Sequence, residues 1–268
     1  MSSGLSIVVC GSVVPDPLQT LEPLAGDKPT LKNESMLPVV LDPWAGHSLY
    51  EAANLAKQIT RSKVYLVSLG PKAKLQQLMM TIAQKVSFEL VVIDAPAGGF
   101  TDSAEVAAAL AEAIAEIPAL DKDNMLLFGG MASAARDAGT TLALVGEKLG
   151  IEDLFLGVDE IKYREDGSFQ VKERIEGGRY QVSECKKAPA VLAWATGNLP
   201  EPSNNPQVGM MNMRGIMPAL QKAKQITLSG SDLKYGAVEI PNQKRQTRIV
   251  KDATPAQIAE ELAAWIKA

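Results

Sequence analysis

Histidine is nearly absent from this chain, since His47 is the only one among its 268 residues. A metal site built from several histidines is therefore excluded, and a zinc site of two cysteines and one histidine would need every Cys and His present. A nucleophile activated by histidine would have to rely on His47. His47 stands at the start of a helical pattern, where a polar residue of the helix start is the ordinary interpretation.

Cysteine is also scarce, and the 31 acidic residues outnumber the 27 basic ones. Cys10 and Cys185 lie in apolar or strand-like stretches, which gives no disulfide framework and fits a reducing cytoplasm. The net charge of −4 and the pI near 5.3 argue against binding of nucleic acid through electrostatic attraction. No apolar run reaches about 18 residues, so we expect no membrane span. The first apolar run has no basic segment before it and is expected to be a strand rather than a signal peptide.

Strand-like and helix-like segments alternate through the first two thirds of the chain. Strands are expected at 5–10, 62–70, 88–95 and 124–130, and helices at 45–59, 72–85, 102–117 and 140–150. This order predicts an α/β fold with a mainly parallel sheet and helices on both faces. Ligands of such sheets bind at the carboxyl ends of the strands. We therefore expect a site at the loops that follow Cys10, Leu69, Asp94 and Phe128.

The pattern changes in the last third of the chain. Residues 159–196 alternate apolar and polar side chains around two turn signals, which predicts an antiparallel hairpin addition. Residues 197–213 read as a long loop, and 214–224 as a helix interrupted by Pro218. The last helix is expected at 254–268, with Thr254 as its N-cap. We expect an α/β domain at 1–228 and an extended C-terminal arm at 229–268 that packs on its own domain or on a partner.

The segment "GGMASAARDAGTT" (129–141) joins an apolar strand to a helix start through a turn of small residues. Backbone N–H groups in such a turn can hold a phosphate. The segment lacks the lysine and the spacing of a P-loop, and it is not GxGxxG. The residues alone leave two interpretations open, a nucleotide-binding loop and a plain turn from strand to helix.

Three stretches resemble the beta subunit of electron-transfer flavoproteins, including its nitrogen-fixation branch. They are "IVVCGSVVPDP" (7–17), "VKERIEGGRYQVSECKKAPAVLAWATGNLPEP" (171–202) and "MRGIMPALQKAKQI" (213–226). The second is the strongest, with a basic-x-x-acidic-Gly-Gly hairpin, then Pro-Ala-Val-Leu, then Asn and Glu-Pro. The resemblance implies a three-layer sandwich like that of the adenine-nucleotide alpha hydrolases.

The resemblance also implies an electron carrier without catalysis of its own. Such a subunit forms a heterodimer with an alpha subunit, which holds most of one FAD, and its arm docks on that subunit. The complex passes electrons from a flavin dehydrogenase to a quinone reductase or a similar acceptor. In one branch the beta subunit holds a structural AMP, and in the bifurcating branch it carries an FAD in that place.

The family's nucleotide contacts fall on four loops of this sequence. We expect cofactor-binding residues at Val9, Cys10 and Gly11, at Asp42 and Trp44, at Ser68 and Gly70, and at Gly129, Ala132, Arg136, Thr140 and Thr141. Asp42 stands where the family has Asn, and Gly130 and Met131 stand where it has Lys and Gln. Trp44 occupies the place of an aromatic residue near the flavin, although a core or interface role explains a tryptophan equally well.

The loop 199–213 corresponds to the family's recognition loop for the dehydrogenase. Met213 takes the place of its anchoring leucine, and Met210 and Met211 lie beside it. Methionine suits an adaptable contact surface, and it also suits the core beneath a loop. Two other functions remain open, the bifurcating subunit and a stand-alone adenine-nucleotide-binding protein of the same fold.

Overall fold

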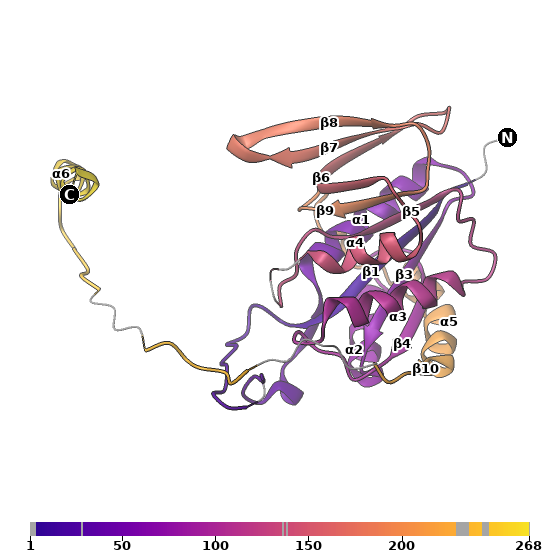
Figure 1. Cartoon of the computed structure of the whole chain (residues 1–268), viewed down its shortest axis with the longest axis horizontal. Helices are drawn as coiled ribbons and strands as arrows, with labels where there is room; N and C mark the ends of the chain where they lie inside the picture. Colours follow the sequence, from indigo (N-terminus) through magenta and orange to yellow (C-terminus); the bar gives the residue numbers. More distant parts are fainter. Residues whose placement is uncertain are drawn as a thin grey trace.

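One large sheet forms the centre of this computed structural model, which describes residues 4–27, 29–135, 137, 139–228, 236–242 and 247–267 (Figure 1). Its strands are β1 (Ser6–Pro15), β2 (Val39–Leu41), β3 (Lys63–Gly70), β4 (Glu89–Asp94), β5 (Met125–Gly130), β6 (Leu154–Tyr163), β7 (Phe169–Ile175), β8 (Arg179–Cys185), β9 (Ala190–Trp194) and β10 (Lys224–Gln225). The helices are α1 (Pro43–Gln58), α2 (Lys72–Ile82), α3 (Ser103–Ala115), α4 (Thr140–Lys148), α5 (Pro206–Lys222) and α6 (Pro255–Lys267). Two short 3-10 helices, Glu34–Met36 and Glu176–Gly178, lie in connections.

The sheet is mainly parallel at its centre. The strand order is β10-β4-β3-β1-β5-β9-β6-β7-β8, with β2 paired antiparallel to β1. The parallel pairs bring the carboxyl ends of β1, β3 and β5 to one edge. These strands are apolar along their length because both faces of the sheet are covered.

Helices cover both faces of the sheet, which gives three layers. One core contains side chains of α1, α2 and α5, and the other contains side chains of α3 and α4. Phe128 and Trp194 are fully buried neighbours in the first core, with ring centroids 5.2 Å apart. The predicted fold class, a mainly parallel sheet flanked by helices, is confirmed.

The predicted hairpin addition is also present. β6, β7 and β8 form an antiparallel meander at one end of the sheet (Figure 1). The turn between β7 and β8 contains Gly177 and Gly178 at φ values of 71° and 69°. Glycine adopts this left-handed conformation without steric cost, so the Gly-Gly pair fits the hairpin turn. β9 then returns parallel to both β5 and β6.

The prediction of a loop over 197–213 is wrong from Pro206 onward, because α5 begins there. The Asn205 Oδ1 accepts hydrogen bonds from the backbone N–H groups of Gln207 (3.0 Å) and Val208 (3.4 Å), and Pro206 takes the first helical position. This cap starts the helix ahead of the methionines. The helix also continues through Pro218, which the sequence analysis treated as an interruption.

The C-terminal segment, described at 236–242 and 247–267, is hydrogen-bonded to the domain through Gly26. The backbone N–H of Gly26 donates to the Val238 carbonyl (3.2 Å), and the Val238 N–H donates to the Gly26 carbonyl (2.8 Å). α6 stands apart from the sheet and its helices in Figure 1, and none of its described side chains is buried. The Gln257 side chain accepts from the N–H of Thr254 (2.9 Å) and the Thr254 hydroxyl accepts from the N–H of Gln257 (3.4 Å), which is a capping box.

Candidate functional site

A cavity opens at the carboxyl ends of the central strands, where the sequence predicts ligand binding. It is a cavity of about 130 Å³ that opens to solvent. Its walls come from the end of β1, the start of α1, the 98–110 segment and the 129–142 segment. The lining residues are Cys10, Gly11, Ser12, Val13, Val14, Asp42, Ala45, Leu69, Gly98, Gly99, Thr101, Val106, Leu110, Gly129, Gly130, Ala132, Ser133, Ala135, Gly139, Thr141 and Leu142.

The turn between β5 and α4 forms one wall because its backbone folds closely on itself. A Cβ atom at Gly139 would overlap the carbonyl oxygen of Met131, and a Cβ at Gly130 would overlap the Cβ of Trp44. Gly139 is the N-cap of α4, and no side chain caps this helix end. Glycine at both positions therefore brings backbone, rather than side chains, to the cavity wall.

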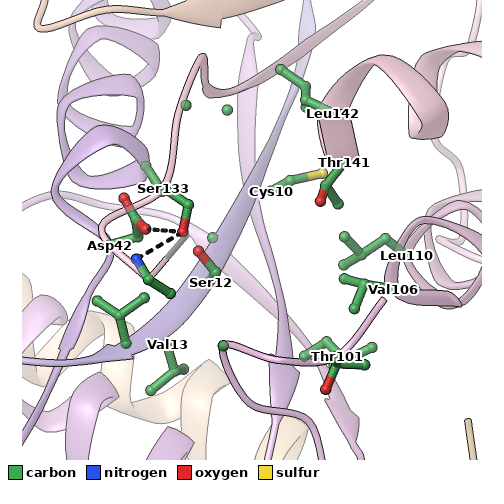
Figure 2. Close-up of a pocket in the computed structure, with 18 of the residues that line it drawn as sticks. Cys10, Ser12, Val13, Asp42, Thr101, Val106, Leu110, Ser133, Thr141 and Leu142 are labelled. Atoms are coloured by element: carbon green, nitrogen blue, oxygen red, sulfur yellow. Dashed lines mark hydrogen bonds between the residues drawn. The ribbon is translucent and has the colours of Figure 1, made fainter. Parts of the chain in front are cut away.

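Asp42 connects this turn to the start of α1. Its Oδ1 accepts from the N–H of Trp44 (3.1 Å), and its Oδ2 accepts from the N–H of Ala134 (2.9 Å). Oδ2 also accepts from the hydroxyl of Ser133 (3.0 Å), as Figure 2 shows. The carboxylate is only 1% exposed. Burial raises its pKa above the usual range, while these hydrogen bonds act in the opposite direction. Asp42 therefore caps α1 and also connects α1 to the turn through hydrogen bonds.

The structure brings half of the predicted cofactor residues to the cavity wall. Cys10, Gly11, Asp42, Gly129, Ala132 and Thr141 line it, whereas Val9, Trp44, Ser68, Gly70 and Thr140 are not among its lining residues. Val9 lies in the core, and the buried Ser68 hydroxyl donates to the Gly11 carbonyl (2.9 Å) within the sheet. Arg136 lies outside the described residues.

The loop after β4, which ends at Asp94, also lines the cavity, as expected from its place at this edge, but none of its residues was among the predicted cofactor contacts. Gly98, Gly99 and Thr101 reach the cavity from the loop, and Val106 and Leu110 reach it from α3; Thr101, Val106 and Leu110 are labelled in Figure 2. The run of small residues ahead of the N-cap Asp102 is the signal that could have identified these contacts. These residues make the opposite wall largely apolar, as a binding surface for a flat organic ring requires.

Most side chains that line the cavity are small or apolar. Burial raises the pKa of the Cys10 thiol to about 12, so the thiol stays neutral near pH 7 and is a poor nucleophile. No lysine or arginine is found among the described lining residues. Within the described ranges, no group of three or more His, Cys, Asp or Glu side chains could hold a metal ion.

The comparison with protein families decides what kind of protein carries this cavity. The model of the electron transfer flavoprotein domain matches residues 34–227, which include the hairpins and most of the cavity lining but not residues 10–14 of β1. The chain belongs to the electron transfer flavoprotein family. A search of curated proteins finds no match.

Membership of this family places the cavity in a protein of the electron-carrier class. Electron transfer flavoprotein domains belong to electron carriers that generally bind flavin. In the described part of the chain, no helix is long and apolar enough to cross a membrane.

A second polar cluster of this electron transfer flavoprotein domain lies where the β7–β8 hairpin meets the end of β9. The Arg174 guanidinium donates to both carboxylate oxygens of the buried Asp159 (2.9 and 3.1 Å) and to the hydroxyl of Thr196 (3.1 Å). Asn198 donates through its side chain to the Asp159 carbonyl (3.0 Å) and through its backbone to Glu51 on α1 (3.0 Å). These contacts fix the hairpin and the loop after β9 to α1.

The methionines predicted to recognise a dehydrogenase lie on α5 of the electron transfer flavoprotein domain. Met210 and Met211 are 67% and 69% exposed. Met213 is half-buried and packs against the core shared by α1, α2 and α5. Asn212, between them, is buried, and its amide donates to the carbonyls of Ala83 and Val86 (both 2.7 Å). The exposed pair therefore stands on a helix that is anchored to the end of α2.

Proposed function

We propose that this chain is the beta subunit of a heterodimeric electron-transfer flavoprotein. It would help to hold FAD at the interface with an alpha subunit and pass electrons from a flavin dehydrogenase to a quinone reductase or similar acceptor, in the cytoplasm. The observation that carries the proposal is the cavity at the carboxyl ends of the central strands, most of whose lining residues lie within the family match. The bound flavin would supply the redox chemistry, and this chain would supply binding and orientation.

The cavity is proposed to hold the adenosine part of an adenine nucleotide, with AMP as the expected ligand. Leu69, Val106, Leu110 and Leu142 give it apolar walls for a ring system, and the glycine-rich turn gives it exposed backbone. Large apolar surface with a few polar groups is the usual composition of such sites. The neutral Cys10 thiol adds no charge to the floor of the cavity.

The C-terminal arm, residues 229–268, is proposed to dock on the alpha subunit. α6 carries Ile258, Leu262, Trp265 and Ile266, which are 47%, 48%, 67% and 85% exposed. A helix with such an apolar face gains stability by burying it against another surface. The arm would bury this face in the heterodimer.

The proposed surface for the dehydrogenase is the exposed start of α5. Met210 and Met211 project from it, and their flexible thioether side chains suit an adaptable contact. The half-buried Met213, expected from the sequence to be the anchor, would support this helix from below through its packing on the core.

Coexpression with an alpha-type subunit tests the proposal. We expect a yellow heterodimer with one FAD, an adenine compound released from it on denaturation, and little flavin in the isolated chain. Two FAD per heterodimer would establish the bifurcating type of subunit instead. A colourless monomer that does not bind the alpha-type subunit would contradict both types of electron-transfer subunit. It would support a stand-alone nucleotide-binding protein.

A variant that lacks residues 247–268 tests the arm in the same system. The truncated chain should keep its α/β domain, because the described side chains of α6 are not buried in it. It should lose the alpha subunit during size-exclusion chromatography. Retention of the partner at unchanged affinity would exclude the arm as the docking element.

A further inference from the structure

Two hydrogen-bond donors of the β5–α4 turn, the Ser133 hydroxyl and the Ala134 N–H, are already used by a carboxylate of the chain itself. The Asp42 Oδ2 accepts from the hydroxyl of Ser133 and the backbone N–H of Ala134, while its Oδ1 accepts from the N–H of Trp44 at the start of α1. Hydroxyl and N–H groups at a turn and at a helix start are the donors that normally hold a phosphate. Asp42 thus fills an anion-binding position from within.

The charge around the cavity also disfavours the binding of a phosphate. Asp42 is the only acidic residue among the described lining residues, and none of these residues is basic. A phosphate that entered beside the turn would meet a buried negative charge at short range, where electrostatic repulsion is strong. It would also find the Ala134 N–H already engaged.

From these contacts we propose that Asp42 is a specificity-determining residue of the cavity. Asp42 weakens the binding of a phosphate group, so the cavity recognises the adenosine part of the ligand. The proposal rests on the proposed adenine-nucleotide function of the cavity. It assigns binding of the adenosine part to the apolar walls and the glycine-rich backbone, both of which are independent of the charge at Asp42.

The substitution Asp42→Asn isolates the charge and one acceptor. Asparagine is as good a helix N-cap as aspartate, so its Oδ1 can still accept from the N–H of Trp44. Its Nδ2 would replace Oδ2, which turns an acceptor into a donor and releases the N–H of Ala134. The cavity would then present an uncharged, donor-rich corner to a phosphate.

The test compares the dissociation constants of adenosine and AMP by isothermal titration calorimetry, on the full-length chain in complex with its partner. In the wild type we expect the two constants to agree within about threefold, because the charge of Asp42 repels the phosphate of AMP. In Asp42→Asn we expect AMP to bind about 10-fold to 100-fold more tightly, the effect of one hydrogen bond to a charged group. Adenosine should bind both proteins equally.

Asp102→Asn is the matched control. Asp102 caps α3 beside the same cavity, and its Oδ1 accepts from the N–H of Ala104 (3.1 Å), but neither it nor that N–H lines the cavity. The control should leave both constants unchanged. If Asp42→Asn does not fold, Asp42→Ser carries the test, because serine also caps helices without a charge.

An unchanged ratio of the AMP and adenosine constants in the folded Asp42 variant would overturn the role of Asp42 while leaving the cavity as a nucleotide site. The same holds if wild-type protein already binds AMP more than tenfold tighter than adenosine. Binding of neither compound by the wild type and all variants would overturn the adenine-nucleotide function of the cavity, and the role of Asp42 with it.

Discussion

Replacing the buried Asn212 of α5 with alanine should destabilise the protein strongly. The Asn212 amide donates to the carbonyls of Ala83 and Val86, and all three residues are less than 10% exposed. Water cannot replace the lost donor at these buried carbonyls. Each buried acceptor left unsatisfied costs about 1–1.5 kcal/mol, so the variant should lose about 2–3 kcal/mol.

Urea unfolding followed by circular dichroism measures this loss, with Gln207→Ala as the control on the same helix. Gln207 is exposed, so its truncation should change the free energy of unfolding by less than about 0.5 kcal/mol. Because Asn212 holds the helix that carries Met210 and Met211, the variant should also slow electron transfer from the dehydrogenase. An Asn212→Ala protein within about 0.5 kcal/mol of the wild type would refute the reasoning.

Three further predictions concern the cavity, the polar cluster and α5. Gly139→Ala should cost about 1–3 kcal/mol, since a Cβ has no room there, whereas Gly46→Ala, in a helix with open space, should be neutral or stabilising; thermal unfolding compares them. Burial raises the pKa of Glu51 above its ordinary 4.5, so the folded state binds that proton more tightly and stability falls as pH rises above 4.5. Glu51→Gln should therefore gain stability over the wild type between pH 4.5 and 7 in urea titrations, and a constant difference would exclude this cause. Replacing Met210 and Met211 together with alanine should slow stopped-flow reduction by the dehydrogenase without changing FAD content, and an unchanged rate would exclude the methionine surface.

The parts of the fold that follow local patterns could be predicted from the sequence. The apolar strands and the small-residue turn after Phe128 identified the sheet and the edge at which the cavity opens. α5 was partly missed because its first turn contains residues typical of loops, although Asn205 and Pro206 form a standard helix start. Its buried face, Gly209, Asn212, Ile216 and Leu220, has helical spacing but includes a polar and a glycine residue.

The part of the site that depends on distant contacts could not be predicted. Asp42 meets Ser133 and Ala134 across about 90 positions of the chain, and no local pattern encodes such a contact. The same applies to Ser68, whose hydroxyl is used by the neighbouring strand rather than by the cavity. Whether Met213 or its neighbours are exposed also depends on where α5 begins.

Stopped-flow reduction of the reconstituted heterodimer by a reduced flavin dehydrogenase tests the central claim most directly. The account predicts that the FAD bound by the complex is reduced by the dehydrogenase and reoxidised when the acceptor is added, and that FAD bound by the alpha subunit alone is reduced much more slowly. If FAD bound by the alpha subunit alone is reduced and reoxidised as fast as in the heterodimer, the account is contradicted.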